Sequence, residues 1–142
     1  MTVLARLVTP ARVLLAVYLL VPLVLTLSPV APGRGLEDFH AALQPLVAAL
    51  TGDRAQIDLG EAEALGNVLL FLPIGLLVPL AVPGIAPLLV LVGAGLASLA
   101  VEALQSRVLE ARQPALQDVL HNMGGAAIGL VLVGEVLRRT RR

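Results

Sequence analysis

The chain has 142 residues, of which 58% are hydrophobic and 14% are charged, and its mean hydropathy is +0.92. This composition excludes an ordinary soluble domain and is typical of an integral membrane protein. The formal net charge of zero gives no indication of a nucleic-acid partner, and a chain without cysteine can form no disulfide, thiolate metal site or cysteine nucleophile.

Four apolar stretches each approach the roughly 17 to 25 residues that a membrane-spanning helix needs. They predict an all-α integral membrane bundle of four transmembrane helices within a single domain of residues 1–142. The helices are expected at about 13–30, 65–82, 85–105 and 118–137, with an outer loop at about 31–64. Pro10 would then precede the first helix, where a proline costs little.

Within the outer loop, apolar residues recur at spacings of three and four between Leu36 and Leu50. This pattern predicts a short helix at the membrane interface, interrupted by Pro45. Residues 31–64 also contain six acidic residues and only two arginines, so the loop is expected to face outward.

Basic residues flank the predicted bundle at both ends of the chain, and every one of them is arginine. Because the cytoplasmic flanks of membrane helices are enriched in basic residues, both termini are expected in the cytoplasm. Arginine without lysine is typical of a GC-rich bacterium, so we expect a multi-pass protein of a bacterial cytoplasmic membrane. The flanking arginines are Arg6, Arg12, Arg138, Arg139, Arg141 and Arg142.

The third apolar stretch contains polar residues along one side. Ser98, Glu102 and Gln105 are spaced by four and three residues and therefore share one helix face. An ionisable group inside a membrane span costs several kcal/mol unless it is paired or lines a wet cavity. Glu102 is therefore the default candidate for a functional residue.

The fourth stretch repeats this spacing with Asp118, Asn122 and Gly125. We expect the two polar faces to meet near the outer membrane surface, where Asn67 at the outer end of the second helix joins them. Gly125 and Gly129 form a small-xxx-small pattern, which here indicates close packing of helices within the chain rather than dimerisation.

The charged residues of this cluster suggest separate roles. Asp118 lies at a helix start, where exposed amide donors stabilise a carboxylate. Glu102 is either a proton donor or a fixed anion, depending on whether burial or a paired arginine dominates. Arg112, with Arg107 as a second candidate, can hold a carboxylate or a phosphate oxygen.

A purely structural explanation of the cluster also stands, because polar side chains between membrane helices often serve as packing contacts worth about 0.6 kcal/mol each. His121 lies about 100 degrees around the helix from Asn122 and is expected to face away from the cluster. Two acids and one histidine make a poor ligand set, so no metal and no cofactor are expected. Glu135 is expected to pair with Arg138 and Arg139.

Three motifs, in order and at similar separations, resemble those of the VanZ-like membrane proteins: NVLLFLPIG from Asn67, SLAVEALQ from Ser98 and ARQPALQDVLHNMGG from Ala111. The resemblance covers residues 67–129. It implies a site at Asn67, Glu102, Gln105, Arg112, Asp118 and Asn122. The named member of that family is associated with teicoplanin resistance, and the resemblance implies no established reaction.

The first functional hypothesis is an enzyme or binder that acts on an outer-leaflet lipid or a lipid-linked precursor of the cell envelope. The candidate catalytic residues are Glu102, Asp118 and Arg112, and the candidate substrate-binding residues are Asn67, Ser98, Gln105 and Asn122. The alternative is a non-catalytic structural or accessory membrane protein. A small transporter subunit is a third hypothesis, and four spans without an internal repeat argue against an autonomous carrier.

Overall fold

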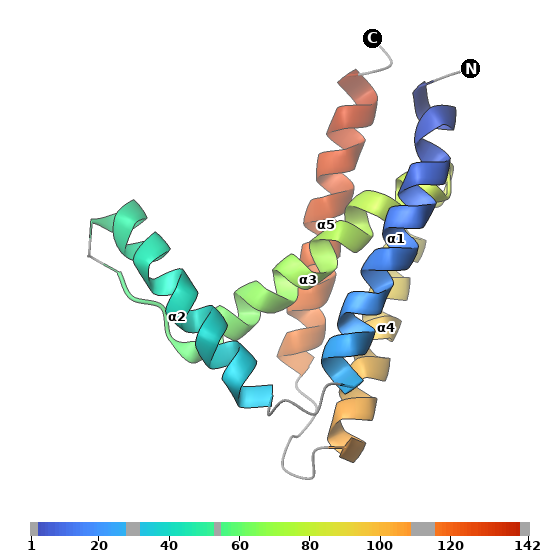
Figure 1. Ribbon diagram of the computed structural model, residues 1–142. Coiled ribbons are helices and arrows are strands. Elements are labelled where there is room, and N and C mark those ends of the chain that lie inside the picture. Colours follow the sequence, from blue (N-terminus) through green and yellow to red (C-terminus); the bar gives the residue numbers. More distant parts are fainter. Residues whose placement is uncertain (1–2, 28–31, 53–54, 109–115, 140–142) are drawn as a thin grey trace. The chain divides into compact units, whose positions relative to one another are not determined.

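The computed structural model describes residues 3–27, 32–52, 55–108 and 116–139, and every regular element in these ranges is an α-helix (Figure 1). The five helices are α1 (Val3–Leu27), α2 (Pro32–Thr51), α3 (Leu59–Ala81), α4 (Pro87–Val108) and α5 (Leu116–Arg139). The predicted all-α class is therefore confirmed.

The chain packs as two compact units. Unit 1 comprises Met1–Leu27 and Asn67–Arg142, and unit 2 comprises Ser28–Gly66. Helices α1, α4 and α5 and most of α3 belong to unit 1, while α2 and the first turns of α3 belong to unit 2. All the described residues of the predicted polar cluster lie in unit 1.

The predicted start of the first helix is wrong for a reason that the sequence explains. Helix α1 begins at Val3, so Pro10 lies inside it rather than before it. Arg6 and Arg12 are good helix formers, which allows the helix to extend beyond the apolar run that was used to predict it.

The predicted outer loop is largely helical, and Pro45 does not interrupt its helix. Helix α2 runs through Pro45 to Thr51, because one proline removes a single backbone hydrogen bond and bends a helix without having to end it. Gly52 follows the helix, and its φ of 65° is the left-handed conformation that terminates many helices.

Helix α3 begins earlier than predicted because a capping box precedes the apolar run. The Asp58 carboxylate accepts a hydrogen bond from Glu61 N at 2.8 Å, and the Glu61 carboxylate accepts one from Asp58 N at 2.9 Å. This reciprocal pair satisfies two amides of the first turn and fixes the helix start before Leu65.

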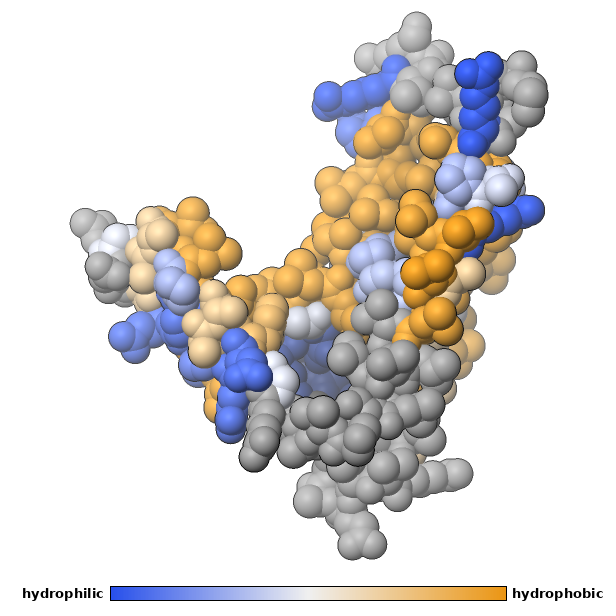
Figure 2. Space-filling view, viewed as in Figure 1, coloured by the Kyte–Doolittle hydropathy of each residue, from blue (hydrophilic) through white to orange (hydrophobic). Residues whose placement is uncertain are grey.

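Two of the described helices, α3 and α5, are long and apolar enough to cross a membrane, and Pro87–Ala103 of α4 is a shorter apolar helix. Large apolar side chains also remain exposed on unit 1, as the orange surface in Figure 2 shows. On α5 they include Leu120, Val131 and Val136. A hydrocarbon environment would accommodate such a surface far better than water.

Helices α3 and α5 approach each other at glycines. A Cβ atom would lie 2.0 Å from a backbone oxygen of the facing helix at Gly75, 2.1 Å at Gly125 and 2.2 Å at Gly129. No other residue fits at such distances, so the predicted role of Gly125 and Gly129 in close packing is confirmed. The neighbouring core, formed by Phe71, Ala94 and Ala126, joins α3, α4 and α5.

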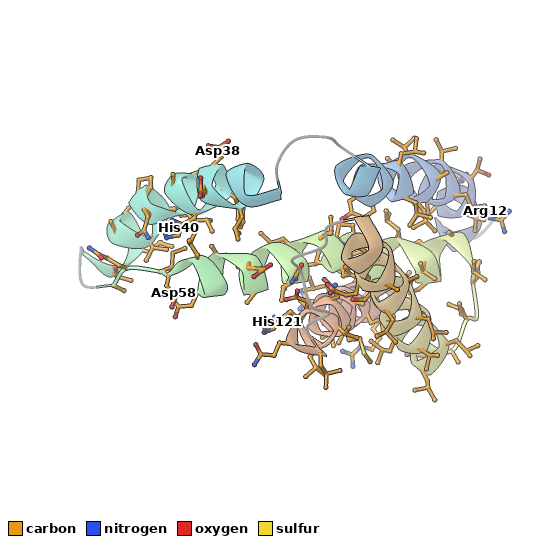
Figure 3. All side chains as sticks on the ribbon, turned by 90° about the horizontal axis from the view of Figure 1, so that it is seen from below. Arg12, Asp38, His40, Asp58 and His121 are labelled. Atoms are coloured by element: carbon orange, nitrogen blue, oxygen red, sulfur yellow. The ribbon has the colours of Figure 1, made fainter. Side chains whose placement is uncertain are left out.

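Helix α1 is attached to α3 by two side chains. Arg12 Nε donates to Ala81 O at 2.9 Å, at the last residue of α3 (Figure 3). A positive charge at a helix C-terminus is stabilised by the carbonyl groups that have no partner within the helix. The Tyr18 hydroxyl donates to Leu70 O, three residues before Pro73, which lies inside α3. These contacts place α1 in the same unit as the polar cluster.

Candidate functional site

Four polar side chains are buried among the described residues, and all four were predicted from the sequence. The exposed fractions are 1% for Ser98, 7% for Glu102, 7% for Asp118 and 6% for Asn122. Ser98 and Glu102 lie on α4, and Asp118 and Asn122 lie on α5, which packs against α4 (Figure 1). The two polar faces therefore lie inside unit 1 rather than on its surface.

Two hydrogen bonds join three helices at this cluster. Asn67 Nδ2 on α3 donates to Asp118 Oδ1 on α5 at 3.0 Å. Asn122 Nδ2 on α5 donates to Ser98 Oγ on α4 at 2.8 Å. The structure thus brings Asn67 to Asp118 and Asn122 to Ser98, and it links the helices through the side chains that the motifs contain.

The local structure explains the different settings of the two acids. Helix α5 begins at Leu116, so Asp118 lies in its first turn, where free amides and the helix dipole stabilise a carboxylate. Glu102 lies six residues before the end of α4 at Val108 and has no helix start beside it. Glu102 and Asp118 each take part in further interactions, so neither residue is without a partner.

Three of the residues predicted for the site cannot be placed in this cluster. Arg112 lies outside the described residues. Gln105 and Arg107 are part of α4, but their side chains lie outside the described part of the chain. Their roles stay predictions.

Two buried polar atoms have no hydrogen-bond partner among the described residues, namely His121 Nδ1 and Asn122 Oδ1. Polar atoms of this kind are uncommon in native structures and deserve a specific explanation. The described residues contain no group of three His, Cys, Asp or Glu side chains arranged to hold a metal ion. The described side chains of the cluster offer two carboxylates, two amides and a hydroxyl for hydrogen bonding.

The predicted pairing at the end of α5 is confirmed. Glu135 binds Arg138, and its other oxygen accepts a hydrogen bond from Arg139 Nε at 2.7 Å. Both arginine side chains are largely exposed, so the group is a surface ion pair of small energetic value. It lies more than three turns along α5 from Asn122 and takes no part in the buried cluster.

A family model described as VanZ/LLP1 matches residues 13–138, which is nearly the whole chain. The chain belongs to the VanZ/LLP1 family. This match confirms the resemblance of the three motifs and extends it over α2 and most of α1, beyond residues 67–129. A search of curated proteins and a search of solved structures found no match.

The first of the three motifs has two structural roles in this VanZ/LLP1 protein. NVLLFLPIG lies on α3 and supplies both Asn67 and the close-packing Gly75. Sequence reasoning assigned no packing role to Gly75, although its spacing of four from Phe71 places both on one helix face. The motif therefore fixes the distance between α3 and α5 as well as supplying a polar side chain.

Proposed function

We propose that this VanZ/LLP1 protein crosses a bacterial cytoplasmic membrane four times and that its polar cluster binds the headgroup of a lipid or a lipid-linked envelope precursor. The burial of Ser98, Glu102, Asp118 and Asn122 in an apolar helical unit is the observation that carries the proposal. Burial of polar groups is costly, and a cluster of them inside a membrane protein usually marks a functional site.

The four proposed spans are α1, α3, α4 and α5. They contain 25, 23, 22 and 24 residues, and at about 1.5 Å per residue each exceeds the roughly 30 Å hydrocarbon core. The start of α1 and the end of α5 lie at the same end of unit 1 (Figure 1), in keeping with both termini on one side. The positive-inside rule makes that side cytoplasmic.

Single-cysteine labelling tests this topology, because the natural chain contains no cysteine and gives no background. We expect Asp38→Cys on α2 to react with a membrane-impermeant maleimide in intact cells. Ala86→Cys, at the exposed turn between α3 and α4, is expected to react only after the cells are permeabilised. The opposite pattern would invert the proposed orientation, and labelling of both in intact cells would contradict four spans.

The chemistry proposed for the cluster follows from its side chains. Asp118, which accepts a hydrogen bond from Asn67, is a fixed anion that orients the site. Glu102 serves as a general acid or base if the protein is an enzyme, and Arg112 holds a phosphate oxygen. Ser98, Gln105 and Asn122 supply hydrogen bonds to the headgroup.

Substitution of Glu102 tests whether the polar cluster is needed for the protein's function. In a teicoplanin-sensitive Gram-positive host we expect the natural protein to raise teicoplanin tolerance. Glu102→Gln is expected to return the host to the level of an empty vector, because the amide can neither carry charge nor transfer a proton. Susceptibility to teicoplanin and vancomycin is measured at matched membrane abundance, with the exposed Glu37→Gln as the control. Full protection by Glu102→Gln would rule out the proposed acid or base.

A structural role for the cluster is the second candidate, and the two interhelical hydrogen bonds favour it, since they satisfy polar groups of one helix with those of another. This alternative predicts that Glu102→Gln and Arg112→Gln each lower membrane abundance. The double substitution would then restore abundance, because it leaves no unpaired charge in the membrane. Under the headgroup-binding proposal, abundance changes little and tolerance is lost in all three variants.

A further inference from the structure

One side of the second half of α2 is apolar and remains exposed. Residues 41–50 contain no charged side chain. Leu46 and Leu50 are 55% and 78% exposed, and Ala42 and Ala49 are exposed as well. Spacings of four and three residues place these four side chains on the same side of the helix. We call them the outer face of α2.

The opposite side of α2 is held by contacts within unit 2. A Cβ atom at Gly66 would lie 3.5 Å from the ring of Phe39. Gln44 Nε2 donates to Ile57 O at 2.6 Å, and His40 Nε2 lies 2.8 Å from the same oxygen. These contacts prevent α2 from turning its outer face into unit 2. Apolar surface is most stable out of water, so we expect a partner from outside the unit.

The chain connections of unit 2 favour the bilayer as that partner. Helix α1 ends at Leu27, and only four residues separate it from the start of α2 at Pro32. At the other end, α3 continues from Gly66 of unit 2 into Asn67 of unit 1 without a break. Because α1 and α3 are both proposed spans, these short connections keep unit 2 at the outer membrane surface.

We propose that the outer face of α2 lies against the outer surface of the membrane, with Leu46 and Leu50 at the boundary between headgroups and acyl chains. This inference rests on the proposed four spans, which bring the bilayer to unit 2. Helices at a membrane surface bury their apolar face about 5–10 Å into this boundary. Glu37 and Asp38, in the first half of α2, are exposed acids that anionic headgroups would repel. Apolar contact therefore holds the helix in place.

Quenching by spin-labelled lipids tests the contact. Single-cysteine variants of the full-length protein are labelled with the dye NBD and placed in phosphatidylcholine vesicles, in which part of the lipid carries a nitroxide near its headgroup. We expect the label at Leu50→Cys to lose most of its emission, because it lies at the depth of the nitroxide. The label at Asp38→Cys, on the same helix but in its charged half, is expected to keep its emission.

Two further substitutions in the Leu50→Cys protein separate the outer face from the rest of α2. Leu46→Glu is expected to restore most of the emission, because a charged side chain on this face opposes entry into the boundary. Ala41→Glu is the matched control. Ala41 is also exposed but lies about 140 degrees around the helix from Leu46, so quenching is expected to persist. Glutamate is a good helix former, which keeps α2 intact in both variants.

A label on α5 distinguishes failure of this inference from failure of the proposed spans. Val131 is 69% exposed, and a label at Val131→Cys is expected to be quenched by lipids with a nitroxide deep in the acyl chain. Quenching at Val131 without quenching at Leu50 would overturn the contact of α2 and leave the spans standing. No quenching at Val131 would contradict both.

Two other results would also overturn the inference. Equal quenching at Asp38 and Leu50 would mean that the dye, rather than the outer face, enters the membrane. A blue-shifted emission at Leu50 that nitroxide lipids leave unchanged would mean that protein, such as a second copy of the chain, covers this face.

Discussion

Gly125→Ala is expected to destabilise the protein by about 3 kcal/mol, at the upper end of what overpacking usually costs. A Cβ at this position would lie 2.1 Å from Val68 O, which is backbone and cannot rotate away. Helices α3 and α5 would have to separate, which would also lengthen the hydrogen bond from Asn67 to Asp118. The expected effect therefore combines lost packing with a weakened polar cluster.

Gly124 provides a matched control one residue away. A Cβ there would have no heavy atom within 4 Å, so Gly124→Ala is expected to be neutral or to stabilise by up to about 1 kcal/mol through helix propensity. The measurement is the unfolding of both variants by SDS in mixed micelles, followed by circular dichroism. Equal stability of the two variants would contradict the close approach of α3 and α5.

The sequence was sufficient to predict the helical class and the buried cluster because both depend on spacing along one helix. Ser98 and Glu102 are four residues apart, as are Asp118 and Asn122, so each pair shares a face whatever the surroundings. A polar face in an apolar helix is most stable against another polar face. The meeting of α4 and α5 therefore follows from local pattern alone.

The sequence did not predict which side chains of the cluster bind each other. The pattern placed Asn67 at the depth of the cluster but did not indicate that its partner is Asp118, because that choice depends on how closely α3 approaches α5. The approach is set by Gly75 and its backbone contact with Ala126. A glycine in an apolar run is compatible with either a flexible backbone or close helix packing. Only the position of the facing helix distinguishes the two roles.

Helix boundaries failed for a different physical reason. The apolar runs indicate what a membrane would bury, whereas backbone hydrogen bonding continues past them wherever a cap or a good helix former allows. Asp58 and Glu61 start α3 before Leu65, and Arg6 lies within α1 although it is charged. Hydropathy thus located the apolar runs but not the ends of the helices that contain them.

The polar contact between Asn67 and Asp118 depends on the close packing of α3 against α5 at the glycines. At Gly75 and Gly125 the backbones of α3 and α5 lie closer than any side chain would permit. Only at that separation does the short side chain of Asn67 reach Asp118. The asparagine, glycine and aspartate positions of the motifs on α3 and α5 therefore act together, because the glycines allow the helices to come close enough for the polar side chains to meet.

The hydrogen bond from Asn67 to Asp118 is expected to show a coupling energy of about 2 kcal/mol in a double-mutant cycle, the range for a bond to a charged group. The cycle uses Asn67→Ala, Asp118→Ala and the double variant, with unfolding by SDS as the measurement. A second cycle on Asn122 and Ser98 serves as the matched reference, because that pair is buried in the same unit and neutral.

The reference pair is expected to show a coupling of about 0.6 kcal/mol, the average for polar contacts between membrane helices. A clear excess for Asn67 and Asp118 would support an anionic Asp118 that orients the site. Equal couplings would mean that Asp118 is not an anion in the folded protein, and its assigned role as a fixed charge would then be wrong. In that case Glu102 would be the only buried acid among the described residues left to carry the negative charge of the cluster.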